Sequence, residues 1–145
     1  MLVSHLFDAG TMEIRLRAST SQGGRVDAGW SQDFSSSGDS VHLNIRDGDD
    51  VANLNVKSEG GQGETSVVSA TVGDWHTYRI DWSDDAAVFY IDDAWKTTET
   101  SNVPGAVNIS FRIRVTSGAS VEVDLVNLHV PPVPAPTATA TPTPM

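Results

Sequence analysis

The 145-residue sequence contains no cysteine. Disulfide bonds, thiol catalysis and cysteine-based metal sites are therefore excluded. Positive charge is also scarce, because nine Lys and Arg residues stand against nineteen Asp and Glu residues and give a formal net charge of −10. A surface of this charge repels nucleic acid and anionic membranes, so we expect neither as a partner. A neutral polymer such as a polysaccharide meets no such barrier.

Other signals are missing as well. No apolar run approaches the length needed to span a membrane. The first ten residues, MLVSHLFDAG, lack the basic start and long apolar core of a signal peptide, so either a signal has been removed or this chain is part of a longer protein. The four histidines, at positions 5, 42, 76 and 129, lack the spacing of metal ligands. No stretch shows a helical period, which predicts an all-β fold.

Large aromatic residues gather in the stretch 74–95, DWHTYRIDWSDDAAVFYIDDAW. Apolar and polar residues alternate over 76–82 and again over 87–92, as in two half-buried strands. The four residues between them, 83–86, predict a hairpin turn, and a third strand is expected to begin at Trp95. Three of the four tryptophans and both tyrosines lie here, which favours the packing centre of a sheet over a binding site.

The same alternation predicts strands along most of the remaining chain, separated by turns and glycine-containing loops. These strands are expected over 10–18, 26–34, 40–46, 52–57, 65–72, 107–115 and 121–130. Residues 1–130 have the size of one domain.

From Pro131 the composition changes to PPVPAPTATATPTPM. Proline and threonine cannot build a core, so residues 131–145 are predicted to form a disordered linker. Linkers of this composition separate the modules of secreted bacterial proteins. We therefore expect an extracellular or cell-surface location, with neighbouring modules joined through this tail.

The central hairpin resembles one found in glycoside hydrolase family 16, the laminarinases and lichenases of the concanavalin A-like superfamily. WHTYRIDW followed by VFYIDD is similar to the family's FHTYxxxW…WYVDG hairpin, and EVDLVNLHV resembles its closing strand. The resemblance covers roughly Gly10–Val130. It implies an antiparallel two-sheet β-sandwich, a concanavalin A-like jelly roll, in which the family's first strands are absent or reduced to Leu2–Ala9.

The strand 40–46, SVHLNIR, corresponds through this resemblance to the catalytic strand of the family. That strand reads E-I-D-I-E or E-x-D-x-x-E, and its carboxylates supply the nucleophile, an assisting Asp and the general acid/base. Here the three positions carry Ser40, His42 and Asn44. Retaining hydrolysis requires two carboxyl groups about 5–5.5 Å apart. The resemblance therefore implies the fold but argues against the activity.

Other residues of the chain are poor substitutes for the missing catalytic carboxylates. Asp39 and Asp47 share the parity of the core-facing residues, and Glu59 and Glu64 lie in a glycine-rich loop. The acidic stretch 47–50 lacks the spacing of a calcium loop, so it is interpreted as a solvated turn. A serine and a histidine two apart on one strand are about 6.5–7 Å apart at the backbone, with no acid to orient the imidazole, so a Ser–His catalyst is also disfavoured.

Neutral polar residues are predicted to line the cleft in place of the carboxylates. Amides and hydroxyls in a row suit hydrogen bonding to sugar hydroxyls, and an indole ring can stack on a sugar. For Trp30 and for Trp95, packing in the core is an equally open interpretation. The predicted glycan-binding residues are Trp30, Ser40, His42, Asn44, Asn53, Asn55 and Lys57.

One metal is implied by the resemblance alone. The family often binds a structural calcium ion on its convex face through an Asp of the closing strand and main-chain carbonyls. Asp124 matches that Asp, whereas the N-terminal carbonyl donors are expected to be missing. No other cofactor is expected.

Three functions stay open. The favoured hypothesis is a non-catalytic carbohydrate-binding or surface-display module of a secreted modular protein, binding a neutral glycan in the cleft of the sandwich. The alternatives are a divergent glycoside hydrolase acting on β-glucans or galactans, and a structural spacer domain. The residues at 40, 42 and 44 separate the first from the second, but fold does not imply function, so the spacer stays open.

Overall fold

The computed structural model describes residues 6–7, 9–34, 38–46, 51–58, 64–69, 73–105, 107–108, 110–130 and 140–144. All regular elements in these ranges are strands, so the all-β prediction is confirmed. The strands are β1 (Leu6–Phe7), β2 (Gly10–Thr20), β3 (Arg25–Ser31), β4 (Ser40–Arg46), β5 (Val51–Lys57), β6 (Glu64–Ser69), β7 (His76–Trp82), β8 (Ala87–Ile91), β9 (Ala94–Glu99), β10 (Val107–Asn108), β11 (Ser110–Val115) and β12 (Ala119–His129).

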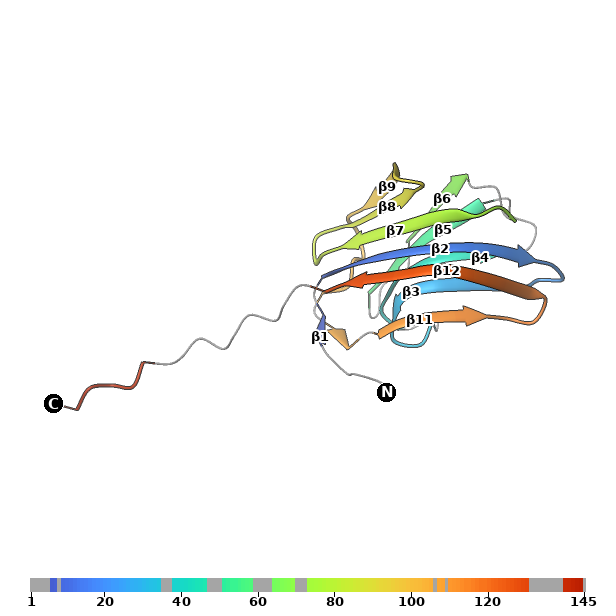
Figure 1. Cartoon of the computed structure of the whole chain (residues 1–145). Coiled ribbons are helices and arrows are strands. Elements are labelled where there is room, and N and C mark those ends of the chain that lie inside the picture. The colour runs from blue at the N-terminus through green and yellow to red at the C-terminus, as the bar shows by residue number, and fades with distance from the viewer. Residues whose placement is uncertain are drawn as a thin grey trace.

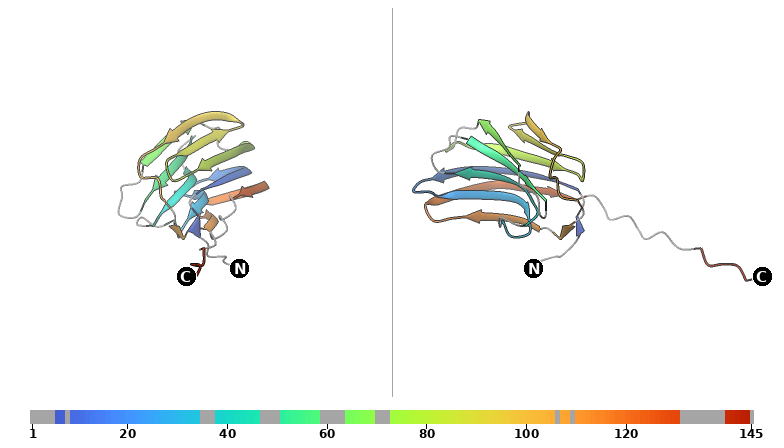
Figure 2. Two further views of the ribbon diagram at one scale, coloured as in Figure 1. Left: turned by 90° about the vertical axis from the view of Figure 1, so that its left-hand side faces the viewer. Right: turned by 180° about the vertical axis from the view of Figure 1, so that it is seen from behind.

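Two five-stranded antiparallel sheets lie face to face (Figure 1). The front sheet has the order β12-β2-β7-β8-β9, and the back sheet has the order β11-β3-β4-β5-β6. Figure 2 shows the two layers from the end and from behind. A short pair of strands, β1 with β10, lies beside them. The predicted two-sheet β-sandwich is confirmed. In the described ranges no helix is long and apolar enough to cross a membrane.

Period-two alternation builds the core between the sheets. On β2, Met12, Ile14 and Leu16 are 0% exposed, while the residues between them are half-buried. On β4, Val41 and Leu43 face the same core and are also 0% exposed. Each such side chain contributes roughly 1.5–3 kcal/mol by leaving water.

The central hairpin is the packing centre that the sequence predicts. Tyr78 and Phe89 are at most 1% exposed and stack with ring centroids 6.3 Å apart. Trp82 is 3% exposed, and its indole N–H donates to the carbonyl of Pro104 over 3.2 Å. The predicted turn is closed by a 2.9 Å bond from the amide of Ser83 to the carbonyl of Ala86.

Several predicted boundaries shift. The strand predicted over 26–34 ends at Ser31, and Phe34 has a φ of 57° that turns the chain back over the back sheet. The strand predicted over 65–72 runs from Glu64 to Ser69, which places Glu64 in a strand rather than in the preceding loop. Residues 47–50, Glu59 and most of the predicted linker, 131–139, lie outside the described residues.

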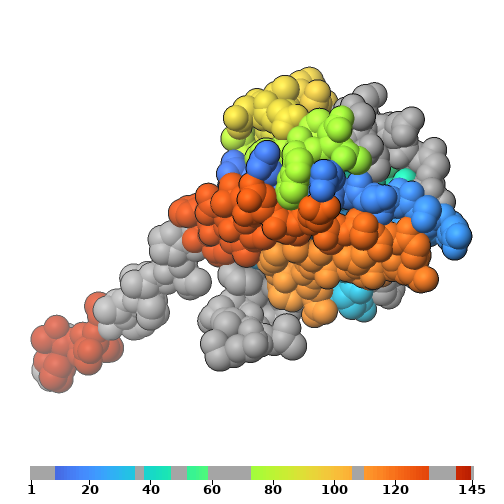
Figure 3. All heavy atoms as spheres, turned by 45° about the vertical axis from the view of Figure 1, so that its right-hand side comes forward, coloured from blue at the N-terminus to red at the C-terminus, as the bar shows by residue number. Residues whose placement is uncertain are grey.

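The core is open along one edge. Ile113 and Val115 on β11 and Val123, Val126 and Leu128 on β12 are 38–43% exposed. Their strand partners on β3 and β2 lie in the closed core, so these five side chains sit on the inner faces of the sheets. Figure 3 shows β11 and β12 side by side on the surface. Both are terminal strands of their sheets, so in the described ranges no further strand continues either sheet beyond this edge.

Candidate functional site

The outward side of strands β3, β4, β5 and β11 is the polar face of the back sheet. The six polar residues predicted on β4 and β5 lie on it as three cross-strand pairs, because the two strands are antiparallel and in register. The pairs are Ser40 with Lys57, His42 with Asn55, and Asn44 with Asn53.

Strand β3 adds a carboxylate that the sequence analysis did not weigh. Asp27 lies directly opposite Asn44, and its side chain is fully buried. The signal was present in the sequence, because Val26, Ala28 and Trp30 alternate with Asp27 and face the core. The same alternation turns Asp27 to the polar face.

Four side chains converge on the carboxylate of Asp27. Arg25 approaches Oδ1 with Nη2 at 2.7 Å, and the amide of Asn44 donates to Oδ1 over 2.6 Å. Arg114, from β11, approaches Oδ2 with Nε at 2.8 Å and Nη2 at 2.7 Å. Nε2 of His42 is 3.4 Å from Oδ1. Both carboxylate oxygens of Asp27 are therefore occupied by donors.

These contacts set the charge of the cluster. Burial on its own raises the pKa of Asp27, but the contacts with His42, Arg25 and Arg114 outweigh it and hold that pKa well below its usual range. We assign most of the lowering to the two guanidinium groups, because they lie at 2.7–2.8 Å and carry a fixed charge, whereas His42 is 3.4 Å away. Asp27 is therefore an anion at physiological pH.

The imidazole of His42 is buried beside this ion pair. Burial lowers the pKa of His42, and Asp27 opposes that effect while Arg25 and Arg114 add to it. His42 is therefore neutral near pH 7. Within the described part of the chain, neither ring nitrogen of His42 has a well-aligned hydrogen bond, nor does Oδ1 of Asn44. Such buried groups are expected to bind ordered water, since leaving each unpaired costs about 1–3 kcal/mol.

Phe34, which follows β3, covers part of this cluster. The ring of Phe34 packs edge-on against His42 with centroids 5.0 Å apart, and the guanidinium of Arg114 lies over the same ring at 5.1 Å. Ser31 accepts a 2.7 Å hydrogen bond from the amide of Phe34. Ser40, His42, Asn44 and Asn53 are only 0–6% exposed. They belong to the polar face, as predicted, but they do not lie open in a cleft.

Other members of the face reach solvent. Asn55 and Lys57 on β5 and Arg112 on β11 are partly exposed, and Arg46 at the end of β4 is exposed. Arg112 lies opposite Gly29, which in turn lies opposite His42. The accessible groups therefore surround the covered cluster.

Trp30 lies elsewhere. It is 2% exposed and packs in the core, with its ring centroid 6.4 Å from Trp82 and 6.1 Å from Phe111. The expectation that Trp30 offers a stacking face beside the polar residues is therefore corrected in favour of core packing. Trp95 is 63% exposed on β9 of the front sheet, whose outer side faces away from the polar face.

The residues around Asp124 do not fit a calcium site. Asp124 lies on β12, and its carboxylate forms an ion pair with Arg15 of β2. The guanidinium of Arg15 is thus paired with the carboxylate that would have to bind the calcium ion. Among the described residues, no cluster of three or more His, Asp or Glu side chains is arranged to hold a metal.

Comparisons with known proteins match this architecture. Sheep galectin-11, in a complex with glycerol, is 11% identical with a TM-score of 0.61, covering 88% of this chain and 93% of that one. A Bacillus licheniformis β-glucanase is 20% identical with a TM-score of 0.56, covering 85% and 54%. A Crh5 transglycosylase, in a complex with NAG, is 25% identical with a TM-score of 0.57, covering 80% and 49%.

The chain thus spans about half the length of the glucanase and the transglycosylase. No curated protein matches it. The model of glycosyl hydrolases family 16 matches residues 4–116, a range that includes the polar face and the central hairpin. On this match, and on its sandwich fold, the chain belongs to glycosyl hydrolases family 16.

Proposed function

We propose that this domain binds a glycan on the polar face of the back sheet and does not hydrolyse it. One observation carries the proposal. Strand β4, which the resemblance matches to the catalytic strand of the family, presents Ser40, His42 and Asn44 outward. The carboxylate that β3 adds beside them, Asp27, is buried and saturated with donors.

Glycoside hydrolysis requires a carboxyl group that gives up a proton and a second one that attacks the sugar or activates water. Asp27 cannot act as the acid, because its pKa is held well below its usual range and it carries no proton to donate. It is also a poor nucleophile, because both its oxygens accept hydrogen bonds and Phe34 helps to cover the cluster. Asp39, at the entrance to β4, is 2% exposed.

Ligand contacts are assigned to the members of the face that reach solvent. Asn55 offers an amide, and Lys57, Arg46 and Arg112 offer cationic donors. The buried residues, including His42 and Asn44, hold these strands in register rather than touching the sugar. The ligand therefore lies across the strands around Phe34.

We propose that the domain works as a module of a secreted protein, with residues 131–145 joining it to its neighbours. Family membership and the composition of the tail support this assignment. Localisation of the protein expressed in its native host tests it, and retention in the cytoplasm would contradict it.

Binding is tested by calorimetric titration with laminarin, lichenan and agarose oligosaccharides. Asn55→Ala is expected to weaken binding about threefold to tenfold, the effect of one lost hydrogen bond. The matched control is Asn127→Ala, which removes an exposed amide from β12 of the front sheet and leaves the affinity unchanged. Equal loss in both variants would move the site away from the polar face. Absence of binding to every glycan would favour the alternative that the domain is a structural spacer.

Hydrolysis is tested by the release of reducing sugar from the same substrates. We expect none above background. Release above background would refute the proposal. Its loss in an Asp27→Asn variant whose circular dichroism spectrum matches that of the wild type would assign the hydrolysis to the carboxylate of β3.

A further inference from the structure

Cations are concentrated on the polar face. Five of the nine Lys and Arg residues of the chain lie there, although the net charge is −10. Against them, Asp27 is the single carboxylate at the described outward positions of β3, β4, β5 and β11. The five cations are Arg25, Arg46, Lys57, Arg112 and Arg114, placed outward by the register of these strands.

Two of these cations oppose each other directly. Arg25 on β3 is the cross-strand partner of Arg46 on β4. Like charges at directly opposite positions destabilise a sheet. The carboxylate of Asp27 reaches Arg25, whose side chain is 28% exposed, while Arg46 points to solvent. An anionic group bound between the two arginines would remove this repulsion.

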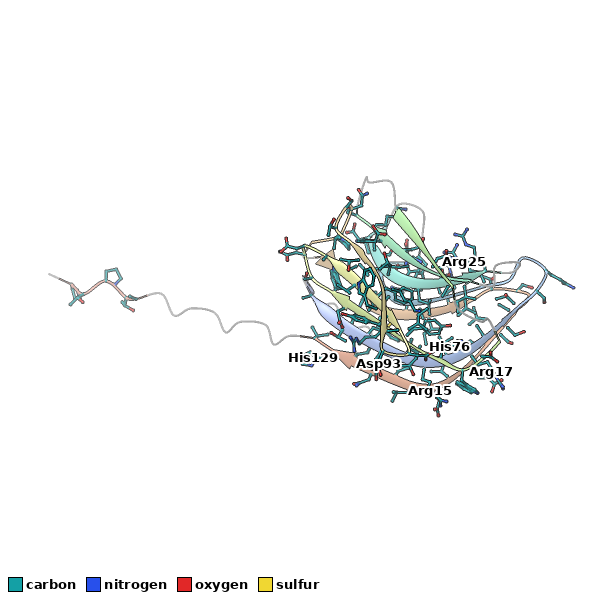
Figure 4. All side chains as sticks on the ribbon, turned by 90° about the horizontal axis from the view of Figure 1, so that it is seen from above. Arg15, Arg17, Arg25, His76, Asp93 and His129 are labelled. Carbon is teal, nitrogen blue, oxygen red and sulfur yellow. The ribbon has the colours of Figure 1, made fainter. Side chains whose placement is uncertain are left out.

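The arginines of the front sheet each have an acid of their own, whereas Arg25 and Arg114 of the polar face share Asp27. Arg15 is paired to Asp124, Arg17 to Glu122 and Arg79 to Asp81. Figure 4 shows Arg25 on the side of the back sheet and Arg15 and Arg17 on the other side. The net charge of the chain therefore does not describe the charge on the polar face. The expectation of a neutral glycan came from that total, whereas a ligand meets the local field of one face.

We propose that the glycan bound by the polar face carries carboxylate or sulfate groups. This inference rests on the proposed function and names its ligand class. Arginine offers a planar fork of donors that suits both groups, and lysine adds a point charge. Arg112 on β11 and Lys57 on β5 are three strand spacings apart across the sheet, about 14 Å, and two residues apart along the strands, about 7 Å, so their backbones are about 16 Å apart. With both side chains extended outward, one acidic sugar contacts only one of them, so the ligand is an oligosaccharide with repeated anionic groups.

The experiment uses matched polymers. Laminarin, cellulose oligosaccharides and galactan are each prepared in neutral, C6-carboxylated and sulfated forms, and each is titrated into the whole chain at 50 and 200 mM salt. We expect a charged form to bind at least about tenfold more tightly than its neutral parent, which is the worth of one charge-assisted hydrogen bond. Raising the salt concentration should reduce this advantage. The preferred form tells carboxylate from sulfate.

The variants locate the effect. Arg112→Gln combined with Lys57→Gln is expected to lower the affinity for the charged form to that of the neutral form. The matched control, Arg15→Gln with Lys96→Gln, removes the same two charges from the front sheet and should leave the preference intact. Because all four positions are partly exposed, the variants are expected to fold.

The outcomes separate the two proposals. Equal affinity for the charged and neutral members of each pair overturns the anionic ligand and leaves glycan binding standing. A preference lost equally in the control variant also overturns it, because the effect would then follow the total charge. Binding to none of the polymers refutes both proposals.

Discussion

Asp27→Asn tests the central ion cluster of the domain. The change keeps the shape of the side chain but removes its charge, leaving Arg25 and Arg114 without their counterion. Removing one partner of a fully buried pair costs about 3–5 kcal/mol. The two arginine side chains are 28% and 34% exposed, so water recovers part of their solvation. We therefore expect a loss of about 2–4 kcal/mol at pH 7, or roughly 10 °C in Tm.

The loss should depend on pH in one direction. The pKa of Asp27 is lowered in the folded state, so its ionisation stabilises the fold above the unfolded value of 3.8. That contribution disappears as pH falls below this value. The difference between wild type and Asp27→Asn is therefore expected to be full at pH 7 and to shrink between pH 4 and pH 2.

The assay is urea unfolding followed by tryptophan fluorescence at both ends of this pH range. Trp30 and Trp82 are buried and report the loss of the core. Asp124→Asn is the matched control, because its pair with Arg15 is about half exposed, and it is expected to cost less than about 1 kcal/mol. A loss under 1 kcal/mol in Asp27→Asn, or one that does not change with pH, would refute the reasoning.

Three further predictions concern the scaffold. In Gly29→Ala the new Cβ would lie 2.6–2.8 Å from atoms of β4, so we expect this change to destabilise the domain far more than Gly73→Ala, where φ is also positive but no atom of the described residues lies within 4 Å. Equal effects would rule out the clash. Thermal unfolding should show that Leu43→Ala lowers the free energy of unfolding by about 2–5 kcal/mol, because the Leu43 side chain is 0% exposed. Leu128→Ala should cost less than half of that, because Leu128 is 41% exposed on the open edge. Similar losses would contradict an open edge. Because the pKa of His42 is lowered on folding, the free energy of unfolding should fall as pH drops below 6.5, the pKa of a histidine in the unfolded chain, and His42→Gln should weaken this dependence. A pH profile unchanged by the substitution would exclude His42 as its source.

Restoring the family's carboxylates on β4 is expected to unfold the domain rather than to activate it. Ser40→Glu, His42→Asp and Asn44→Glu would place three acids at positions that are 0–6% exposed, next to the ionised Asp27. Burying unpaired charges costs several kcal/mol each, so the triple variant is expected to lose its fold before it gains activity.

Local alternation in the sequence determined much of this protein. The pleat of a strand sends successive side chains to opposite faces, so the pattern alone assigned the core residues of β2, β4 and β7 and the polar row of Ser40, His42 and Asn44. Extended to β3, the same rule would have placed Trp30 in the core and Asp27 on the polar face. The comparison with family clefts placed Trp30 among the glycan-binding residues and left Asp27 unassigned, although the alternation along β3 indicates the correct face for both.

Tertiary structure decided what local pattern cannot express. The two arginines of β11 reach the polar face because that strand pairs with β3, which lies more than 80 residues earlier in the chain. The turn at Phe34 then covers His42 and converts a predicted cleft into a buried ion cluster. The open edge likewise depends on which strands end each sheet. Burial and local charge arise from contacts between distant segments, whereas alternation reports only the face on which each residue lies.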